Sequence, residues 1–262
     1  PGCSRGCNTL IGVRKNEILR LEPRYNEDVN QWWMCDEGRL GTYKHVNNER
    51  TRISSPLIRP EEAEESKELM VTTDWEEAVS KSVSVLSGKK SKILFIASPF
   101  STLEDNYAFK RFAKEVFGSS DISYIPNLDE KFGDELLRKN DRTPNSTGLE
   151  RMGIKPLSEN VIKEIATGKF KVIYAINDDI SRAEALKPYL KEIDVYIYHL
   201  NTANEFAFAN AEVIFPESTY AEINGTFMNF QGRIQRIKPA VATLEQERLM
   251  GEFEMSRLDK FG

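Results

Sequence analysis

The sequence of 262 residues has few of the groups on which many enzymes depend, with three cysteines, two histidines and no Gly-x-Gly-x-x-Gly motif. This leaves little material for a histidine-rich metal site or for the usual dinucleotide fingerprint. No apolar run approaches the roughly 20 residues that cross a bilayer, and the N-terminus lacks the pattern of a signal peptide. Acidic residues outnumber basic ones by 41 to 36, so the basic footprint of a nucleic-acid-binding protein is missing. We therefore expect neither a membrane span nor a nucleic-acid partner.

The residues that are present are typical of a folded globular protein, with 40% hydrophobic residues and a net charge of −5. Residues 8–13 and 17–22 alternate apolar and polar side chains around Lys15-Asn16, which predicts a hairpin of two short strands. The acidic run at 61–68 is typical of a solvated connector. We predict a small β-rich domain at residues 1–52 and a second domain at residues 53–262.

The second domain has the pattern of strands followed by helices. Capping-box spacings predict two helices, one from Thr73 and Glu76 to about Leu86 and one from Thr102 and Asp105 to Gly118. Continuous apolar runs predict buried strands at 93–97, 171–176, 194–199 and 212–215. Two shorter helical segments are expected at 183–190 and 203–210. The sequence therefore predicts an open, doubly wound α/β sheet with helices on both faces.

Three other regions give weaker expectations. Residues 127–154 are polar and rich in turn residues, which predicts a long surface excursion. Residues 243–262 have the pattern of a helix, and Asn224-Gly225 is typical of a tight turn. His45 and His199 are expected to be structural. We expect Trp32 and Trp33 either to shield a metal centre at the neighbouring Cys35 or to belong to the core.

All three cysteines lie in the small N-terminal domain, as Cys3, Cys7 and Cys35. Their spacing is Cys-x3-Cys, then 27 residues, then the third cysteine. A [4Fe-4S] cluster takes one thiolate per iron, so a complete site needs four. A Cys-Pro-Gly-Cys run would supply the fourth directly before Pro1, so we expect this sequence to begin inside its own motif. Ordinary thiols, a disulfide between Cys3 and Cys7, and zinc bound by two or three thiolates are the alternatives.

The pattern Cys-x2-Cys-x3-Cys-x27-Cys, with residues 35–39 reading Cys-Asp-Glu-Gly-Arg, resembles the iron-sulfur segment that opens the molybdopterin-oxidoreductase superfamily. Within that superfamily, the sequence is most similar to the large iron-sulfur subunit, of the G type, of bacterial NADH-quinone oxidoreductase (respiratory complex I). Residues 52–59, 75–78, 140–145, 210–216 and 221–235 carry further parts of the resemblance.

The resemblance implies that Cys3, Cys7 and Cys35 ligate a [4Fe-4S] cluster and that the α/β domain is a scaffold of the superfamily fold. In the molybdenum and tungsten enzymes, a lysine lies two residues after the last cysteine, between cluster and pterin. Here that position is Glu37. The central region, about 126–169, is also short, and no cysteine remains to ligate molybdenum. These departures imply a degenerate domain that binds no molybdopterin.

The function implied by the resemblance is that of an iron-sulfur segment of NADH-quinone oxidoreductase. Its cluster would serve electron transfer or structural support in the peripheral arm, on the cytoplasmic side of the inner membrane. The expected partners are other peripheral-arm subunits, including the subunit that binds flavin and NADH. We expect no NADH site and no catalytic residues in this chain itself. The alternatives are a cofactor-free assembly module with a vestigial cluster site, and a subunit of a molybdenum-dependent formate dehydrogenase.

Overall fold

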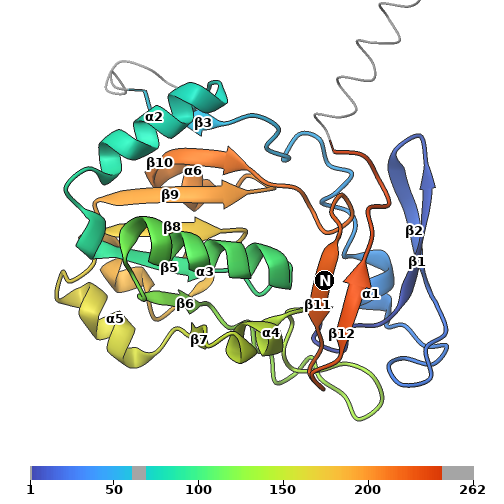
Figure 1. Ribbon diagram of the computed structural model, residues 1–262. Coiled ribbons are helices and arrows are strands. Elements are labelled where there is room, and N and C mark those ends of the chain that lie inside the picture. Colours follow the sequence, from blue (N-terminus) through green and yellow to red (C-terminus); the bar gives the residue numbers. More distant parts are fainter. Residues whose placement is uncertain (1, 61–68, 244–262) are drawn as a thin grey trace, which may run out of the picture.

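The computed structural model describes residues 2–60 and 69–243, and within these ranges a mixed eight-stranded sheet forms the centre of the protein (Figure 1). The acidic run at 61–68 and nearly all of the helix predicted at 243–262 lie outside the described residues. From edge to edge the sheet contains β4 (Val71–Thr72), β3 (Leu57–Ile58), β10 (Ala211–Pro216), β9 (Val195–Leu200), β8 (Val172–Ile176), β5 (Ile93–Ala97), β6 (Ile122–Tyr124) and β7 (Lys155–Pro156). The strands from β10 to β7 are parallel, whereas β3 pairs antiparallel with β10 and β4. The predicted α/β fold class is confirmed.

The central strands form where the sequence has continuous apolar runs. Every residue of β5 and of β8 is buried. A parallel strand covered on both faces buries all its side chains, so an uninterrupted apolar run is favoured over alternation. The four strands predicted from these runs are present, with their ends shifted by no more than one residue.

Helices cover both faces of the sheet. One face packs against α2 (Trp75–Leu86), α3 (Leu103–Phe117) and α4 (Ser146–Arg151), and the other against α5 (Glu159–Ala166) and α6 (Glu205–Asn210). Short 3₁₀ turns lie at Lys90–Lys92, Ile180–Arg182 and Lys187–Glu192. In Figure 1, α2 and α3 lie in front of the strands. Each face has its own apolar cluster, which is the arrangement of a doubly wound fold.

The helix caps agree with the prediction in one case and differ by one residue in the other. Thr102 and Asp105 form the predicted capping box of α3, and Gly118 ends this helix with a φ of 67°. In α2 the predicted pair is wrong, because Asp74 is the N-cap and accepts a hydrogen bond from the Glu77 amide at 2.8 Å. The hydroxyl of Thr73 donates instead to the side chain of Glu77.

Two predictions for the α/β part are corrected. The helix expected at 183–190 is absent, and the 3₁₀ turn Lys187–Glu192 begins in its second half instead, because Pro188 has no amide proton and disfavours an α-helical conformation in the residue before it. The excursion expected at 127–154 is only partly a surface loop. Its second half forms α4, and Leu149 and Ile154 are fully buried there.

The N-terminal element (residues 2–52) contains β1 (Thr9–Arg14), β2 (Glu17–Pro23) and the short helix α1 (Asp36–Leu40). The predicted hairpin is confirmed, since β1 and β2 pair antiparallel and the turn residues Lys15 and Asn16 have φ angles of 50° and 60°. Positive φ at both positions matches the right-handed twist of the strands.

A second hairpin, β11 (Gly225–Met228) and β12 (Ile234–Ile237), lies between the N-terminal element and the sheet (Figure 1). The tight turn predicted at Asn224-Gly225 is wrong, because Gly225 begins β11. Its small size suits a close contact with the start of α3, where an added Cβ would lie 2.6 Å from the methyl group of Thr102. The carboxyl ends of the parallel strands point towards this hairpin and the N-terminal element, so the ends of β5, β8 and β9 face the cysteine-containing part of the chain.

Candidate functional site

The cysteines lie on two segments of the N-terminal element. Cys3 and Cys7 precede β1, and Cys35 is the N-cap of α1, where its sulfur accepts a hydrogen bond from the Gly38 amide at 3.3 Å. All three are half-buried free thiols, so the disulfide alternative is not realised in the structure.

Cys3 is held by a loop of the α/β part. Its sulfur accepts hydrogen bonds from the backbone amides of Lys139 at 3.2 Å and Arg5 at 3.4 Å. The next residue, Ser4, donates its amide to the carbonyl of Asp141 at 2.9 Å. The cysteine segment and the loop around residue 140 therefore form one packed unit.

Cys7 lies in the same neighbourhood as the other two cysteines. Burial, followed by the charges of Cys3 and Cys35, raises the pKa of the Cys7 thiol to about 11, although the charge of Arg5 opposes this effect. Cys3 and Cys35 thus both lie near enough to Cys7 for their charges to act on its thiol. Without a bound cation, Cys7 is a neutral thiol at pH 7.

The arrangement differs from a site for a single ion. In residues 2–60 and 69–243, no three His, Cys, Asp or Glu side chains are grouped so that they could hold one metal ion. A [4Fe-4S] cluster makes a different demand, because each thiolate binds its own iron at a separate corner. Backbone amides directed at the sulfurs of Cys3 and Cys35 also suit such a cluster, since hydrogen bonds to sulfur help to set its properties.

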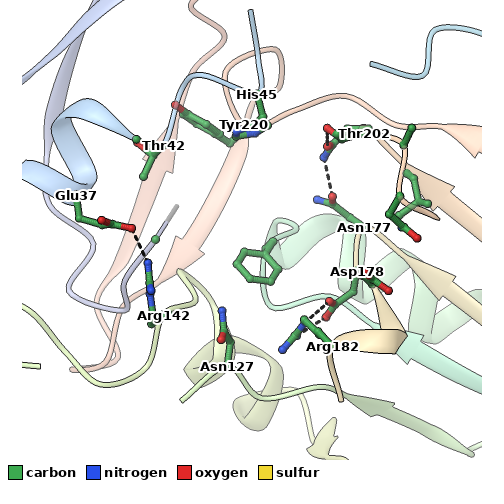
Figure 2. Close-up of a pocket in the computed structure, with 18 residues that line it drawn as sticks. Glu37, Thr42, His45, Asn127, Arg142, Asn177, Asp178, Arg182, Thr202 and Tyr220 are labelled. Atoms are coloured by element: carbon green, nitrogen blue, oxygen red, sulfur yellow. Dashed lines mark hydrogen bonds and ion pairs between the residues drawn. The ribbon is translucent and has the colours of Figure 1, made fainter. Parts of the chain in front are cut away.

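A cavity of about 560 Å³, whose lining residues are drawn in Figure 2, lies next to the cysteine segments, because Gly2 and Glu37 form part of its wall. The N-terminal element contributes Glu37, Thr42 and His45 to its wall. Across from these, its lining includes residues that follow the carboxyl ends of parallel strands, namely Phe100, Asn127, Asn177, Asp178, Asn201 and Thr202. Ligands of open α/β sheets bind at this edge, and the cavity is walled mostly by polar side chains.

An ion pair in the wall of the cavity joins the N-terminal element to the α/β part. The Nη2 atom of Arg142 lies 2.7 Å from Oε1 of Glu37, as the dashed line in Figure 2 shows. Arg142 also stacks over the ring of Phe132 at 4.3 Å and lies 3.9 Å from a carboxylate oxygen of Asp129. Glu37 occupies the position at which the molybdenum and tungsten enzymes carry lysine, and in this chain it has a cationic partner, Arg142.

The other guanidinium of the cavity wall, that of Arg182, is also occupied. Arg182 makes two hydrogen bonds to Asp178, at 2.6 and 2.7 Å, and further ones to the carbonyls of Ile125 and Pro126. Burial raises the pKa of Asp178 to about 6, although Arg182 opposes this effect. Both arginines that line the cavity within the described ranges are thus neutralised by carboxylates.

Glu217 is a second acidic group at the carboxyl edge of the sheet. It directly follows β10, and its Oε1 accepts a hydrogen bond from the Ser101 hydroxyl at 3.2 Å. Oε2 is buried and has no hydrogen-bond partner in the described part of the chain. Burial, followed by the charge of Asp105, raises the pKa of Glu217 to about 8.

The histidines and tryptophans lie in different settings. His199 is a structural residue, as expected: its Nε2 lies 3.0 Å from the hydroxyl of Tyr174, and burial lowers its pKa to about 4. His45 lines the cavity, and burial lowers its pKa. The expectation for Trp32 and Trp33 is wrong, because 68% and 60% of their surfaces are exposed and both expected roles require burial.

The sequence identifies the cysteines but not the groups around them. Nothing in the sequence marks the amide of Lys139, because every residue except proline has one. Arg142 carries a usable signal, since it belongs to the 140–145 stretch that forms part of the resemblance. Glu217 carries one as well, because a carboxylate directly after a predicted parallel strand lies at the ligand-binding edge of an α/β sheet.

Comparisons with known families agree with this geometry. Residues 4–42 match the family described as "NADH-ubiquinone oxidoreductase NDSU1/NuoG-like, 4Fe-4S domain", and residues 137–248 match "Molybdopterin oxidoreductase". The first match includes Cys7 and Cys35 and begins one residue after Cys3. Residues 4–42 are thus similar to a 4Fe-4S domain family and residues 137–248, in the α/β part, to the molybdopterin oxidoreductases.

The curated relatives make the similarity more specific. The chain is 38% identical to the G-type subunit of NADH-quinone oxidoreductase of Pseudomonas fluorescens over 109 residues, 42% of this chain and 11% of that protein. It is 34% identical to the corresponding subunit of Escherichia coli (strain K12) over 113 residues, 43% of this chain and 12% of that protein. It is 29% identical to the corresponding subunit of Streptomyces coelicolor over 122 residues, which are 47% of this chain and 14% of that protein. The matched part thus spans about one-eighth of these relatives, and the resemblance to the G-type subunit is confirmed.

Proposed function

We propose that this chain is an iron-sulfur segment of NADH-quinone oxidoreductase in which Cys3, Cys7 and Cys35 ligate a [4Fe-4S] cluster. The observation that carries the proposal is that three free thiols share one neighbourhood, with backbone amides directed at two of the sulfurs. The fourth ligand is expected directly before Pro1. Residues 1–52 would form the cluster domain and residues 53–262 its α/β scaffold.

The cluster, when bound, supplies one-electron transfer and cross-links two segments that are distant in sequence. The chain's own residues do the rest. The amides of Lys139 and Gly38 donate to the sulfurs of Cys3 and Cys35, and so hold these side chains in place. Arg5 lowers the pKa of Cys7 and offsets part of the burial effect on that thiol.

The residues do not fit a molybdopterin pathway. Glu37 stands where the pterin enzymes carry lysine, and its carboxylate is engaged by Arg142. The phosphates of a pterin dinucleotide need cationic partners, but Arg142 and Arg182 already neutralise carboxylates. A formate dehydrogenase of the molybdenum type is therefore disfavoured, and no step through a pterin is derived.

The place of the protein in a complex follows from the same proposal. We infer that its partners are peripheral-arm subunits, including the one that binds flavin and NADH, and that it lies on the cytoplasmic side of the inner membrane. No helix among the described residues combines the length and the apolar character that a bilayer crossing needs. Attachment to the membrane would then be indirect, through these partners.

Iron and acid-labile sulfide analysis tests the cluster. The intact protein, purified without oxygen, is expected to hold about four iron and four sulfide per site, and Cys7→Ser is expected to lower both. Thr9→Ser, two residues away in β1, is the matched control and should keep the wild-type content. Unchanged iron in Cys7→Ser would remove this residue from the ligand set.

A cofactor-free scaffold with a vestigial site is the second candidate. It is favoured by the geometry, because no three His, Cys, Asp or Glu side chains in residues 2–60 and 69–243 are grouped so that they could hold a metal ion. The two candidates differ in the visible absorption of the oxygen-free protein. A colourless protein with no iron would support the scaffold and overturn the cluster.

A further inference from the structure

The loop at residues 127–142 joins β6 to the segment before α4 and is closed by its own backbone. Leu128 and Asp141 form an antiparallel bridge, and the amide of Asp129 donates to the carbonyl of Asn140 at 2.9 Å. The amide of Arg142 closes the base by donating to the carbonyl of Asn127 at 2.9 Å. The residues at the end of this loop are therefore held in a fixed position.

The same end of the loop contacts both cysteine segments. Lys139 donates its amide to Cys3, and the ammonium of Lys139 lies over the ring of Phe230 at 4.7 Å. Arg142 pairs with Glu37, which is two residues after Cys35 in α1. One loop thus contacts the first cysteine segment through an amide and the second through an ion pair.

Several charges surround the cysteines in this arrangement. The charges of Cys35 and Cys3 contribute to a raised pKa of Arg138, whose main partner is Asp134. Arg138 and Arg142 both stack on the ring of Phe132. A charge near an iron-sulfur cluster changes the energy of adding an electron to it.

We propose that Arg142 and Glu37 form a positioning pair for the cluster, which fixes the 127–142 loop on both cysteine segments and sets the local charge that the cluster experiences. This inference rests on the proposed function, because it needs the cluster to be present. It assigns the loop to the cluster site rather than to the cavity alone. Glu37, which occupies the lysine position of the pterin enzymes, would then belong to the group of residues around the cluster.

An electrostatic role of the pair and a merely structural one predict different shifts of the cluster's reduction potential. Glu37→Gln leaves the Arg142 cation unpaired, which favours the reduced cluster and raises its reduction potential. Arg142→Gln leaves the Glu37 carboxylate unpaired and lowers the potential. If the pair only held the loop in place, both substitutions would loosen the same contact and shift the potential in the same direction.

A redox titration of the intact protein tests the proposal, with dithionite supplying one electron per cluster through mediators and electron paramagnetic resonance following the reduced form. At fixed potential, the ratio of reduced to oxidised cluster is expected to rise by about twofold to fivefold in Glu37→Gln and to fall by a similar factor in Arg142→Gln, the size a partly exposed charge supplies. Both effects should shrink in high salt because salt screens exposed charges. Arg142→Lys keeps the charge and should stay near the wild type.

Arg111→Gln is the matched control, because it breaks an exposed arginine–carboxylate pair within α3, with Glu115 at 2.8 Å. It should leave the potential unchanged. If Arg142→Gln lowers the yield of folded protein, an upward shift in Glu37→Gln with none in Arg142→Lys still supports the proposal. Shifts of the same sign, or none, in an iron-containing protein overturn this inference alone. A wild-type protein without iron overturns it together with the proposed function.

Discussion

Arg52 and Glu222 form a buried ion pair between the end of the N-terminal element and the segment before β11. The Nη2 atom of Arg52 lies 3.0 and 2.8 Å from the two carboxylate oxygens, and the side chains are only 3% and 2% exposed. Arg52 also donates to the carbonyls of Val46 and Asn201, and the amide of Thr219 donates to Glu222. One pair therefore ties three parts of the chain together.

Breaking this pair should destabilise the protein strongly. Arg52→Met leaves the Glu222 carboxylate buried without its cation, and we expect the free energy of unfolding to fall by about 3–5 kcal/mol. Arg52→Met with Glu222→Leu removes both charges and should cost less. Urea unfolding measures these changes. The exposed pair of Arg111 is the comparison, and Arg111→Gln should change the free energy of unfolding far less than Arg52→Met. A similar small loss in Arg52→Met would contradict the role of the pair.

Loss of the cluster should loosen the N-terminal element selectively. This element has about 50 residues, a size at which a hydrophobic core is marginal without a metal or another cross-link. In Cys35→Ala we expect hydrogen exchange before residue 52 to become faster on the order of tenfold, while β5, β8 and β9 keep their protection. Mass spectrometry of exchanged peptides gives both values in one experiment.

Electron transfer gives a second outcome for the same variant. On the proposed function, the resemblance implies a cluster apart from the main electron chain, so NADH oxidation per assembled complex should change little in Cys35→Ala. Activity should fall only as assembled complex falls. If quinone reduction were lost in a complex that assembles normally, the cluster would lie on the electron path.

Glu217 should make stability depend on pH. Its pKa is about 8 in the folded protein and near 4.5 when unfolded, so the folded state binds the proton more tightly. The resulting stabilisation is complete below about pH 4.5 and is lost as the pH rises through 8. Glu217→Gln cannot ionise, so its stability relative to the wild type should increase between pH 5 and 9, on the order of 2–4 kcal/mol.

Urea unfolding at several pH values measures the Glu217 effect. Glu115→Gln in α3 is the control, because Glu115 is exposed and its pKa is lowered, chiefly by a hydrogen bond from Arg111. The stability of that variant relative to the wild type should stay constant over the same range. If the free energies of unfolding of Glu217→Gln and the wild type changed with pH in parallel, Glu217 would be charged in the folded protein between pH 5 and 9.

Metal analysis tests the absence of the pterin. The native complex should hold no stoichiometric molybdenum or tungsten in this domain, and Glu37→Lys should not create formate oxidation. Restoring lysine leaves Arg182 bound to Asp178, so the cavity gains no set of cations for a dinucleotide. Stoichiometric molybdenum in the native complex would contradict the interpretation of the domain as degenerate.

The features that the sequence predicts correctly depend on local pattern. The apolar run Ile93–Ala97 favours a buried strand, because it is too short for a buried helix and has no polar face. The hairpin turn at Lys15-Asn16 and the capping box of Thr102 and Asp105 are likewise decided by a few adjacent residues. The spacing of the cysteines predicts the cluster motif in the same way.

The features that the sequence does not predict depend on contacts between distant segments. An Asn-Gly pair favours a turn, but the packing of Thr102 against Gly225 decides the place of this glycine in a strand. The bond from the Lys139 amide to Cys3 spans 136 positions, and no local pattern contains it. Trp32 and Trp33 are apolar enough to predict burial, but both stay exposed, although the ring of Tyr25 lies 4.5 Å from that of Trp32.

The contact between the first and last hairpins bears on the order in which the protein folds during synthesis. Asn8 donates to Gln235 across 227 positions, and Ile18 shares a small apolar cluster with Val241. At a synthesis rate of about 5–20 residues per second, the later partner follows the earlier one by roughly 11–45 s. Until then, the cysteine segment lacks the hairpin against which it packs. Cys3 and Cys7 thus reach their final surroundings late, so on the proposed function stable iron uptake would report that the described part of the chain has folded.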